Sequence, residues 1–121
     1  MLNSQIGSHF DIYMSSTGYA KYNMVRFKSS EARGEGIQIF REFFASIKKE
    51  VREMKGHVIL ESMSDPQDAI VLTFWEKKDE MDSFYSAPSG SLANLVERVR
   101  PLFEKMPERI DYAVSESHMT L

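Results

Sequence analysis

Residues 68–75 read Asp-Ala-Ile-Val-Leu-Thr-Phe-Trp, and this stretch decides the fold. It is rich in β-branched and aromatic residues and holds no Gly or Pro, which is typical of a strand. The residues just before it, Ser64-Asp65-Pro66-Gln67, favour a tight turn. Residues 57–63 form another run of strand-forming residues upstream of that turn. We therefore predict an antiparallel hairpin with strands over 57–63 and 68–75.

Toward the N-terminus, the sequence predicts a helix and a further strand. Residues 19–27 (Tyr-Ala-Lys-Tyr-Asn-Met-Val-Arg-Phe) are again rich in strand formers. Between residues 35 and 55, apolar side chains recur at every third or fourth position, which predicts a helix with one apolar stripe. Gly56 is expected to cap this helix, because glycine adopts the left-handed conformation without strain. The stripe consists of Ile37, Phe40, Phe44, Ile47, Val51 and Met54.

Toward the C-terminus, two helices and a last strand are expected. A short helix begins near Asp79 and is closed by Pro88, and a further helix covers residues 91–103. Pro101 should end or kink that helix. Residues 109–119 are predicted to form the last strand. The order strand, helix, strand, strand, helix, strand indicates an α+β, ferredoxin-like split βαβ fold, with an antiparallel sheet and helices on one face.

The chain of 121 residues suits one domain with one core. We assign this domain to residues 19–121. Residues 1–18 differ in composition, with Ser, Gly, Asn and Thr around a short alternating patch at 9–14. This segment is expected to be either an N-terminal arm or an extra edge strand.

Composition excludes several classes of function. The sequence has no Cys, which rules out disulfides, thiolate catalysis and Cys-based zinc sites. A net charge of −3 argues against a nucleic-acid partner. No apolar run is long enough to span a membrane and the N-terminus is unlike a signal peptide, so a cytoplasmic protein is predicted. The histidines (His9, His57 and His118) lack metal-ligand spacing, so no metal site is expected.

The predicted sheet is apolar on both faces, which indicates a homodimer. Along residues 68–75, Ala69, Val71, Thr73 and Trp75 point one way, whereas Ile70, Leu72 and Phe74 point the other. Helices can cover only one of these faces, and an exposed patch of this size is unusual for a monomer. A second copy of the chain is the simplest cover for the other face. The alternative is that the N-terminal segment covers it.

The stretch Ala69-Ile-Val-Leu-Thr-Phe-Trp-Glu76, followed by Lys77-Lys-Asp-Glu-Met-Asp-Ser-Phe-Tyr85, resembles the antibiotic-biosynthesis-monooxygenase superfamily. The resemblance extends over about residues 19–117 and implies a dimeric α+β barrel. Members include cofactor-independent oxygenases, quinol oxygenases, haem-degrading enzymes and proteins without known activity. The resemblance therefore implies a monooxygenase that oxidises a small aromatic or quinol substrate without metal or flavin. The alternatives are a haem-binding or haem-degrading monooxygenase and a non-catalytic dimer that binds a small apolar ligand.

The resemblance also suggests catalytic residues. Asn23 and Trp75 match an Asn on the first strand and a Trp at the end of the third strand of the haem-degrading branch. That branch has a His on the following helix, where this sequence has Tyr85 or its neighbours, so its absence argues against haem degradation. Asn23, Trp75 and Tyr85 are the predicted catalytic residues, and the alternative is that Trp75 is a core aromatic and Asn23 a polar residue at a strand end or pocket wall.

An oxygenase without metal or flavin needs a dry aromatic pocket and a few donors that stabilise a developing anion. The oxygenase and haem hypotheses both predict a closed cavity between the helices and the sheet, lined by Asn23, Trp75 and residues such as Phe40, Phe44 and Phe84. Arg26 could instead form a surface ion pair. The predicted substrate-binding residues are Tyr22, Arg26, Phe40, Phe44 and Phe84.

Overall fold

The fold centres on a four-stranded antiparallel sheet in the order β3-β4-β2-β5. The structure is a computed structural model that describes residues 11–13 and 18–120. The strand order and the helical connections are those of the ferredoxin-like split βαβ fold, so the predicted α+β class is confirmed. The strands are β2 (Tyr19–Arg26), β3 (Met54–Glu61), β4 (Asp68–Trp75) and β5 (Glu108–Ala113).

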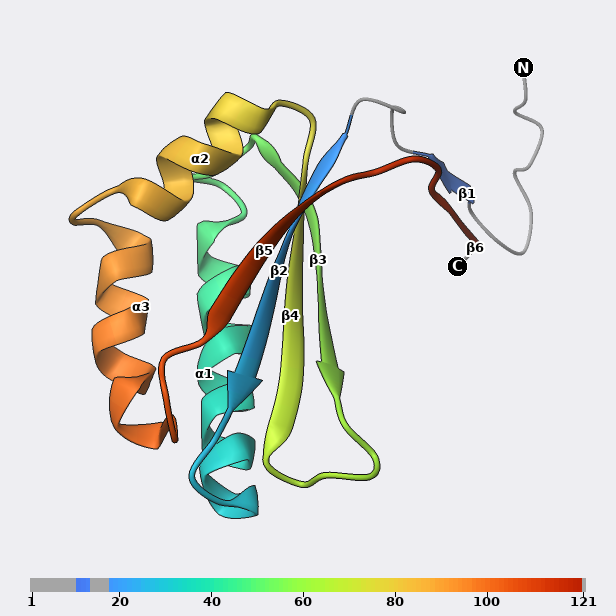
Figure 1. Cartoon of the computed structure of the whole chain (residues 1–121). Coiled ribbons are helices and arrows are strands. Elements are labelled where there is room, and N and C mark those ends of the chain that lie inside the picture. The colour runs from blue at the N-terminus through green and yellow to red at the C-terminus, as the bar shows by residue number, and fades with distance from the viewer. Residues whose placement is uncertain (1–10, 14–17, 121) are drawn as a thin grey trace.

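The helices α1 (Ser30–Ile47) and α3 (Ser91–Val99) cover one face of this sheet, and α2 (Lys78–Ser86) crosses its end (Figure 1). Side chains on β4 alternate strictly, so that Ala69, Val71, Thr73 and Trp75 are buried on the helix side. We call this side the covered face. Its core includes Val25, Phe27, Ile37, Phe40, Phe44, Val99 and Phe103.

Helix α1 differs from the helix predicted over 35–55. It begins earlier, because the Ser29 side chain accepts a hydrogen bond from the Ala32 amide at 3.0 Å and caps the first turn. It also ends earlier, at Ile47. The predicted cap was wrong, since Gly56 lies in β3 opposite Phe74, next to a shift in the strand register.

Val51 and Met54 explain why the helical pattern continued too far. Both residues are partly buried against the same core cluster as the helical stripe, although Val51 lies in a turn and Met54 begins β3. Their spacing therefore fits the stripe by coincidence. Pairing of Met54 with Trp75 in the sheet determines the local structure instead.

The C-terminal elements follow the prediction with two changes. Helix α3 ends at Val99, and a 3₁₀ turn over Arg100–Leu102 contains the expected Pro101. The last strand is interrupted: β5 ends at Ala113, and β6 (His118–Thr120) pairs with β1 (Asp11–Tyr13).

The ribbon formed by β1 and β6 extends away from the main body (Figure 1). The N-terminal strand therefore pairs with the C-terminal one and does not join the four-stranded sheet. Residues 1–10 and 14–17, which make up most of the predicted arm, lie outside the described residues. Among the described helices, none is long and apolar enough to cross a membrane.

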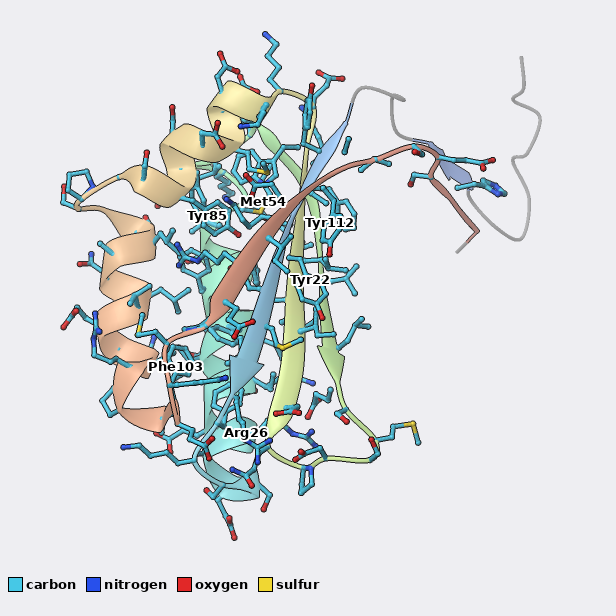
Figure 2. The ribbon with its side chains drawn as sticks, viewed as in Figure 1. Tyr22, Arg26, Met54, Tyr85, Phe103 and Tyr112 are labelled. Carbon is cyan, nitrogen blue, oxygen red and sulfur yellow. The ribbon has the colours of Figure 1, made fainter. Side chains whose placement is uncertain are left out.

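The other face of the sheet, which we call the open face, is lined by apolar side chains without a helix over them. Tyr22 and Tyr112 lie on this side (Figure 2), and their rings meet edge to face with centroids 6.1 Å apart. Four of its side chains are about half exposed: Met24 at 45%, Leu60 at 47%, Ile110 at 45% and Tyr112 at 52%. The register adds Val58, Ile70, Leu72 and Phe74 to the same face.

Candidate active site

A cavity of about 50 Å³ lies between the covered face and the helices. Strands β2, β4 and β5 supply its floor, and the apolar stripes of α1 and α3 supply its walls. Most of the lining is apolar, and the polar side chains are those of Asn23, Tyr85 and Arg109. The apolar lining includes Val25, Phe40, Phe43, Phe44, Val71, Phe84, Leu92, Leu95, Val96, Val99, Phe103, Met106 and Pro107.

Four polar side chains form a connected chain that leads to this cavity, which we call the inner chain: Trp75, Thr73, Tyr85 and Asn23. The Trp75 indole donates to Thr73 Oγ1 at 2.9 Å, and Thr73 Oγ1 lies 2.9 Å from the Tyr85 hydroxyl. The Asn23 amide donates to that hydroxyl at 3.4 Å and to the Val71 carbonyl at 3.0 Å. Residues on two strands and α2 are thereby held in one arrangement.

The hydrogen bonds of Asn23 leave its side-chain oxygen open. The Val71 carbonyl can only accept, so the amide nitrogen must face it. In the described part of the chain, every fully buried side-chain nitrogen or oxygen has a hydrogen-bond partner. Asn23 Oδ1 forms no hydrogen bond with a described residue, so it is not sealed in the protein. Asn23 lines the cavity, and its Oδ1 retains its capacity to accept a hydrogen bond.

Tyr85 is held neutral by its surroundings. Burial raises the pKa of Tyr85, and the hydrogen bonds with Thr73 and Asn23 and the charge of Arg109 only partly oppose this effect. Two cations lie over its ring, Lys21 Nζ and Arg109 Cζ, each 4.9 Å from the ring centroid. Lys21 is itself paired with Asp111 at 2.6 Å. The tyrosine can therefore donate or accept a hydrogen bond at neutral pH without ionising.

The structure brings together most of the residues predicted from the sequence. Asn23, Phe40, Phe44, Phe84 and Tyr85 line the cavity. Tyr85 points into the space between α2 and the sheet (Figure 2).

Trp75 lies on the same side of the sheet as Asn23 but does not line the cavity. It is fully buried, with its ring centroid 5.3 Å from that of Phe84 and 6.4 Å from that of Tyr85. It packs against the lining residues Phe84 and Tyr85 and donates a hydrogen bond to Thr73, so its contribution is to position the inner chain.

Two predicted residues lie elsewhere. Tyr22 is on the open face, and Arg26 is at the opposite end of β2 from α2 (Figure 2). Arg26 forms ion pairs with Asp65 at 2.9 Å, Asp68 at 2.8 Å and Glu104 at 3.0 Å. Arg26 is therefore an ion-pair residue, as the alternative interpretation predicted, and it does not line the cavity.

Sequence reasoning missed Thr73, Lys21 and Arg109. Thr73 is two residues from Trp75, and Lys21 is two residues from Asn23, so strand alternation places both on the covered face. Arg109 is the register partner of Asn23 on β5. The period-two pattern was therefore the signal that could have identified Thr73 and Lys21.

Helix α2 offers no histidine to haem iron, whereas the haem-degrading branch carries a histidine on this helix. His57 stacks on Phe44 with ring centroids 4.1 Å apart, and it does not line the cavity. Across residues 11–13 and 18–120, no group of three His, Cys, Asp or Glu side chains could hold a metal ion.

No protein-family model and no curated protein matches this sequence. Solved structures do match its fold. SnoaB, a cofactor-independent oxygenase from Streptomyces nogalater, superposes with a TM-score of 0.68 at 13% identity, covering 84% of this chain and 96% of SnoaB.

A candidate antibiotic biosynthesis monooxygenase from Chloroflexus aurantiacus gives a TM-score of 0.62 at 18% identity, covering 79% of this chain and 91% of that one. A similar candidate from Caulobacter crescentus gives 0.69 at 10% identity, covering 80% and 89%. The predicted resemblance to this superfamily is therefore confirmed at the level of the fold.

Proposed function

We propose that this protein is a monooxygenase that oxidises a small aromatic or quinol substrate without metal or flavin. The observation that carries the proposal is the inner chain, a fixed set of polar groups that ends at an open acceptor in an apolar cavity. Polar groups held in place in a water-poor site are the means by which a protein favours an anionic intermediate. SnoaB, which is similar in fold, is named as a cofactor-independent oxygenase.

In this reaction the substrate itself reduces oxygen. An electron-rich phenol or quinol gives electrons to O₂; one oxygen atom enters the substrate and the other leaves as water with two hydrogens from the substrate. A hydroquinone and O₂ would thus give a hydroxyquinone and H₂O. Asn23 Oδ1 would accept a hydrogen bond from a ring hydroxyl, which increases the electron density of the ring. The Tyr85 hydroxyl would donate to the oxygen that carries the developing negative charge.

Thr73 and Trp75 would act as positioning residues. The Trp75 indole donates to Thr73 Oγ1, which can still either donate to the Tyr85 hydroxyl or accept from it. In the first arrangement Tyr85 accepts from Thr73 and Asn23, and its own hydrogen points to neither. That arrangement frees one donor of Tyr85 for the substrate.

We further propose that the protein is a homodimer in which a second copy covers the open face. The support is the row of half-exposed apolar side chains at Met24, Leu60, Ile110 and Tyr112. They lie on the central and edge strands of one sheet and form a continuous surface. Burial of such a surface against itself would stabilise a dimeric α+β barrel. A cytoplasmic location likewise remains a prediction.

Oxygen uptake tests the proposed activity. The purified protein would be mixed with simple dihydroxy-aromatic compounds in an oxygen-electrode cell, with catalase and metal chelators present. We expect substrate-dependent uptake that falls at least 100-fold in Asn23→Ala, the range for loss of one preorganised polar group. Asn94→Ala, at an exposed position of α3, is the matched control and should keep full activity.

Two outcomes would contradict the proposal. Ligand binding without oxygen uptake would favour the non-catalytic binding module. A saturable haemin titration with decay of the bound haem under ascorbate and air would favour the haem-degrading alternative.

A further inference from the structure

A second, outer hollow of about 460 Å³ lies next to the cavity. The outer hollow lies between α3, the connection from α2 to α3, and the residues that lead into β5. It shares six lining residues with the cavity: Tyr85, Leu92, Val96, Met106, Pro107 and Arg109. A ligand can therefore occupy both spaces at once, with Arg109 at the junction.

The size of the cavity limits how much of a ligand enters it. An engineered apolar cavity of roughly 150 Å³ holds one benzene ring. The cavity here is about 50 Å³, which is too small for a whole ring and leaves room only for the edge of one. The remainder of such a ligand would have to lie in the outer hollow, where the lining also contains Glu97 and Arg100.

Arg109 is the cation of this junction that lacks a carboxylate partner among the described residues. The acidic side chains near it each have their own cation: Asp111 pairs with Lys21 at 2.6 Å, Glu108 with Lys105 at 3.8 Å, and Glu97 with Arg100 at 3.0 Å. The guanidinium of Arg109 lies over the Tyr85 ring, with Cζ 4.9 Å from the ring centroid. Its guanidinium hydrogens are thus available for an anion, which arginine binds through two parallel hydrogen bonds.

We propose that the ligand is a monocyclic hydroxy-aromatic acid, with its ring hydroxyl at Asn23 and its carboxylate at Arg109. This inference rests on the proposed function and names the substrate class of the same site. Asn23 and Arg109 are register partners on β2 and β5, so their side chains leave the covered face side by side. The long arginine side chain extends to the outer hollow, whereas the short asparagine remains in the cavity.

The test compares an acid with its uncharged analogue. Binding of 3,4-dihydroxyphenylacetate and of 3,4-dihydroxyphenylacetamide would be measured by calorimetry under argon, so that no turnover occurs. We expect the acid to bind at least tenfold more tightly than the amide, the range for one charge-assisted pair at a partly exposed site. Arg109→Gln should abolish this preference and Arg109→Lys should restore part of it. Arg98→Gln, which removes an exposed arginine paired with Glu42, should leave it unchanged.

Equal affinities for the two ligands, binding of neither, or an acid preference that survives in Arg109→Gln would overturn the inference. Oxygen uptake, measured separately in air, distinguishes this result from failure of the proposed function. Oxygen uptake without a preference for the acid would support the oxygenase activity and contradict the acidic substrate class. An Arg109-dependent preference for the acid without oxygen uptake would support the ligand class and contradict the oxygenase activity.

Discussion

The two faces of the four-stranded sheet carry different kinds of side chain, although the same strands supply both. The covered face combines tightly packed apolar residues with the polar inner chain of Asn23, Thr73, Trp75 and Tyr85. Of the side chains named here on the open face, nearly all are apolar, and four of them are about half exposed. Under the proposed function, the covered face would hold the reacting groups, and the open face would bind the second copy of the chain.

Energetics separate the two faces as well. A buried polar group is costly unless it is hydrogen-bonded, so the inner chain is tolerated only because its members satisfy one another. On the open face the unfavourable feature is exposed apolar area. These side chains stabilise the protein only when another surface removes them from water. Changes on the covered face should therefore affect activity and folding, and changes on the open face should affect association.

The largest effect is expected when a charge is placed on the open face. Met24→Lys would put an ammonium group into the proposed dimer interface, where an unpaired buried charge is strongly unfavourable. We expect the dimer dissociation constant to rise at least 100-fold, measured by analytical ultracentrifugation. Met63→Lys is the matched control, because Met63 is fully exposed in the hairpin loop, and it should leave the dimer intact. A wild-type monomer at high concentration would contradict the role of the open face.

The next largest effect concerns packing on the covered face. A Cβ at Gly36 would lie 2.2 Å from Cε1 of Phe27, which is completely buried. Gly36→Ala should therefore lower the free energy of unfolding by about 2 kcal/mol through overpacking. A Cβ at Gly34 meets nothing within 4 Å, so Gly34→Ala should raise that free energy by up to about 1 kcal/mol through helix propensity. Urea unfolding measures the free energy of unfolding of both variants. Equal changes in Gly36→Ala and Gly34→Ala would mean that the contact between residue 36 and Phe27 is not tight.

The contrast between the faces was partly visible in the sequence. Strand alternation over residues 68–75 places Val71, Thr73 and Trp75 on one face, and the order of elements is enough to indicate the ferredoxin-like fold. The end of α1 was not visible, because Val51 and Met54 continue the helical spacing although they belong to a turn and a strand. Local periodicity does not report which long-range pairing ends a helix.

The candidate site was predictable only in its strand residues. Period two places Asn23 on the face opposite Tyr22, so the exclusion of Tyr22 from the cavity also followed from the pattern. The hydrogen bond between Asn23 and Tyr85, by contrast, spans 62 positions and depends on the angle at which α2 crosses the sheet. No local pattern specifies that angle. The ion pairs of Arg26 are also long-range, because they require the β3–β4 hairpin loop to place Asp65, and the segment before β5 to place Glu104, beside the end of β2.

A smaller effect is expected from removing one hydroxyl on each face. Tyr85→Phe removes the group that joins Thr73 and Asn23, and oxygen uptake should fall about tenfold or more. Stability should change by only about 1 kcal/mol, since one hydrogen bond in the network is lost. Tyr112→Phe removes a hydroxyl from the open face and should leave the rate unchanged. If both variants retained full activity, the inner chain would have only a structural role.

The smallest effect should appear in the pH dependence of stability, through His57 at the edge of the covered face. Burial and the charge of Lys48 lower the pKa of His57, whose ring stacks on Phe44. The unfolded chain then binds more protons at His57 than the folded chain does, so stability is complete above about pH 6.5 and declines as the pH falls through that value. His57→Gln should flatten the melting temperature between pH 7.5 and about 5 relative to wild type. The decline caused by Asp65, whose pKa is lowered by hydrogen bonds from Gln67 and Arg26, begins at lower pH and should persist in His57→Gln. If the melting temperature of His57→Gln fell between pH 7.5 and 5 as steeply as that of wild type, His57 would have the same pKa in the folded and unfolded states.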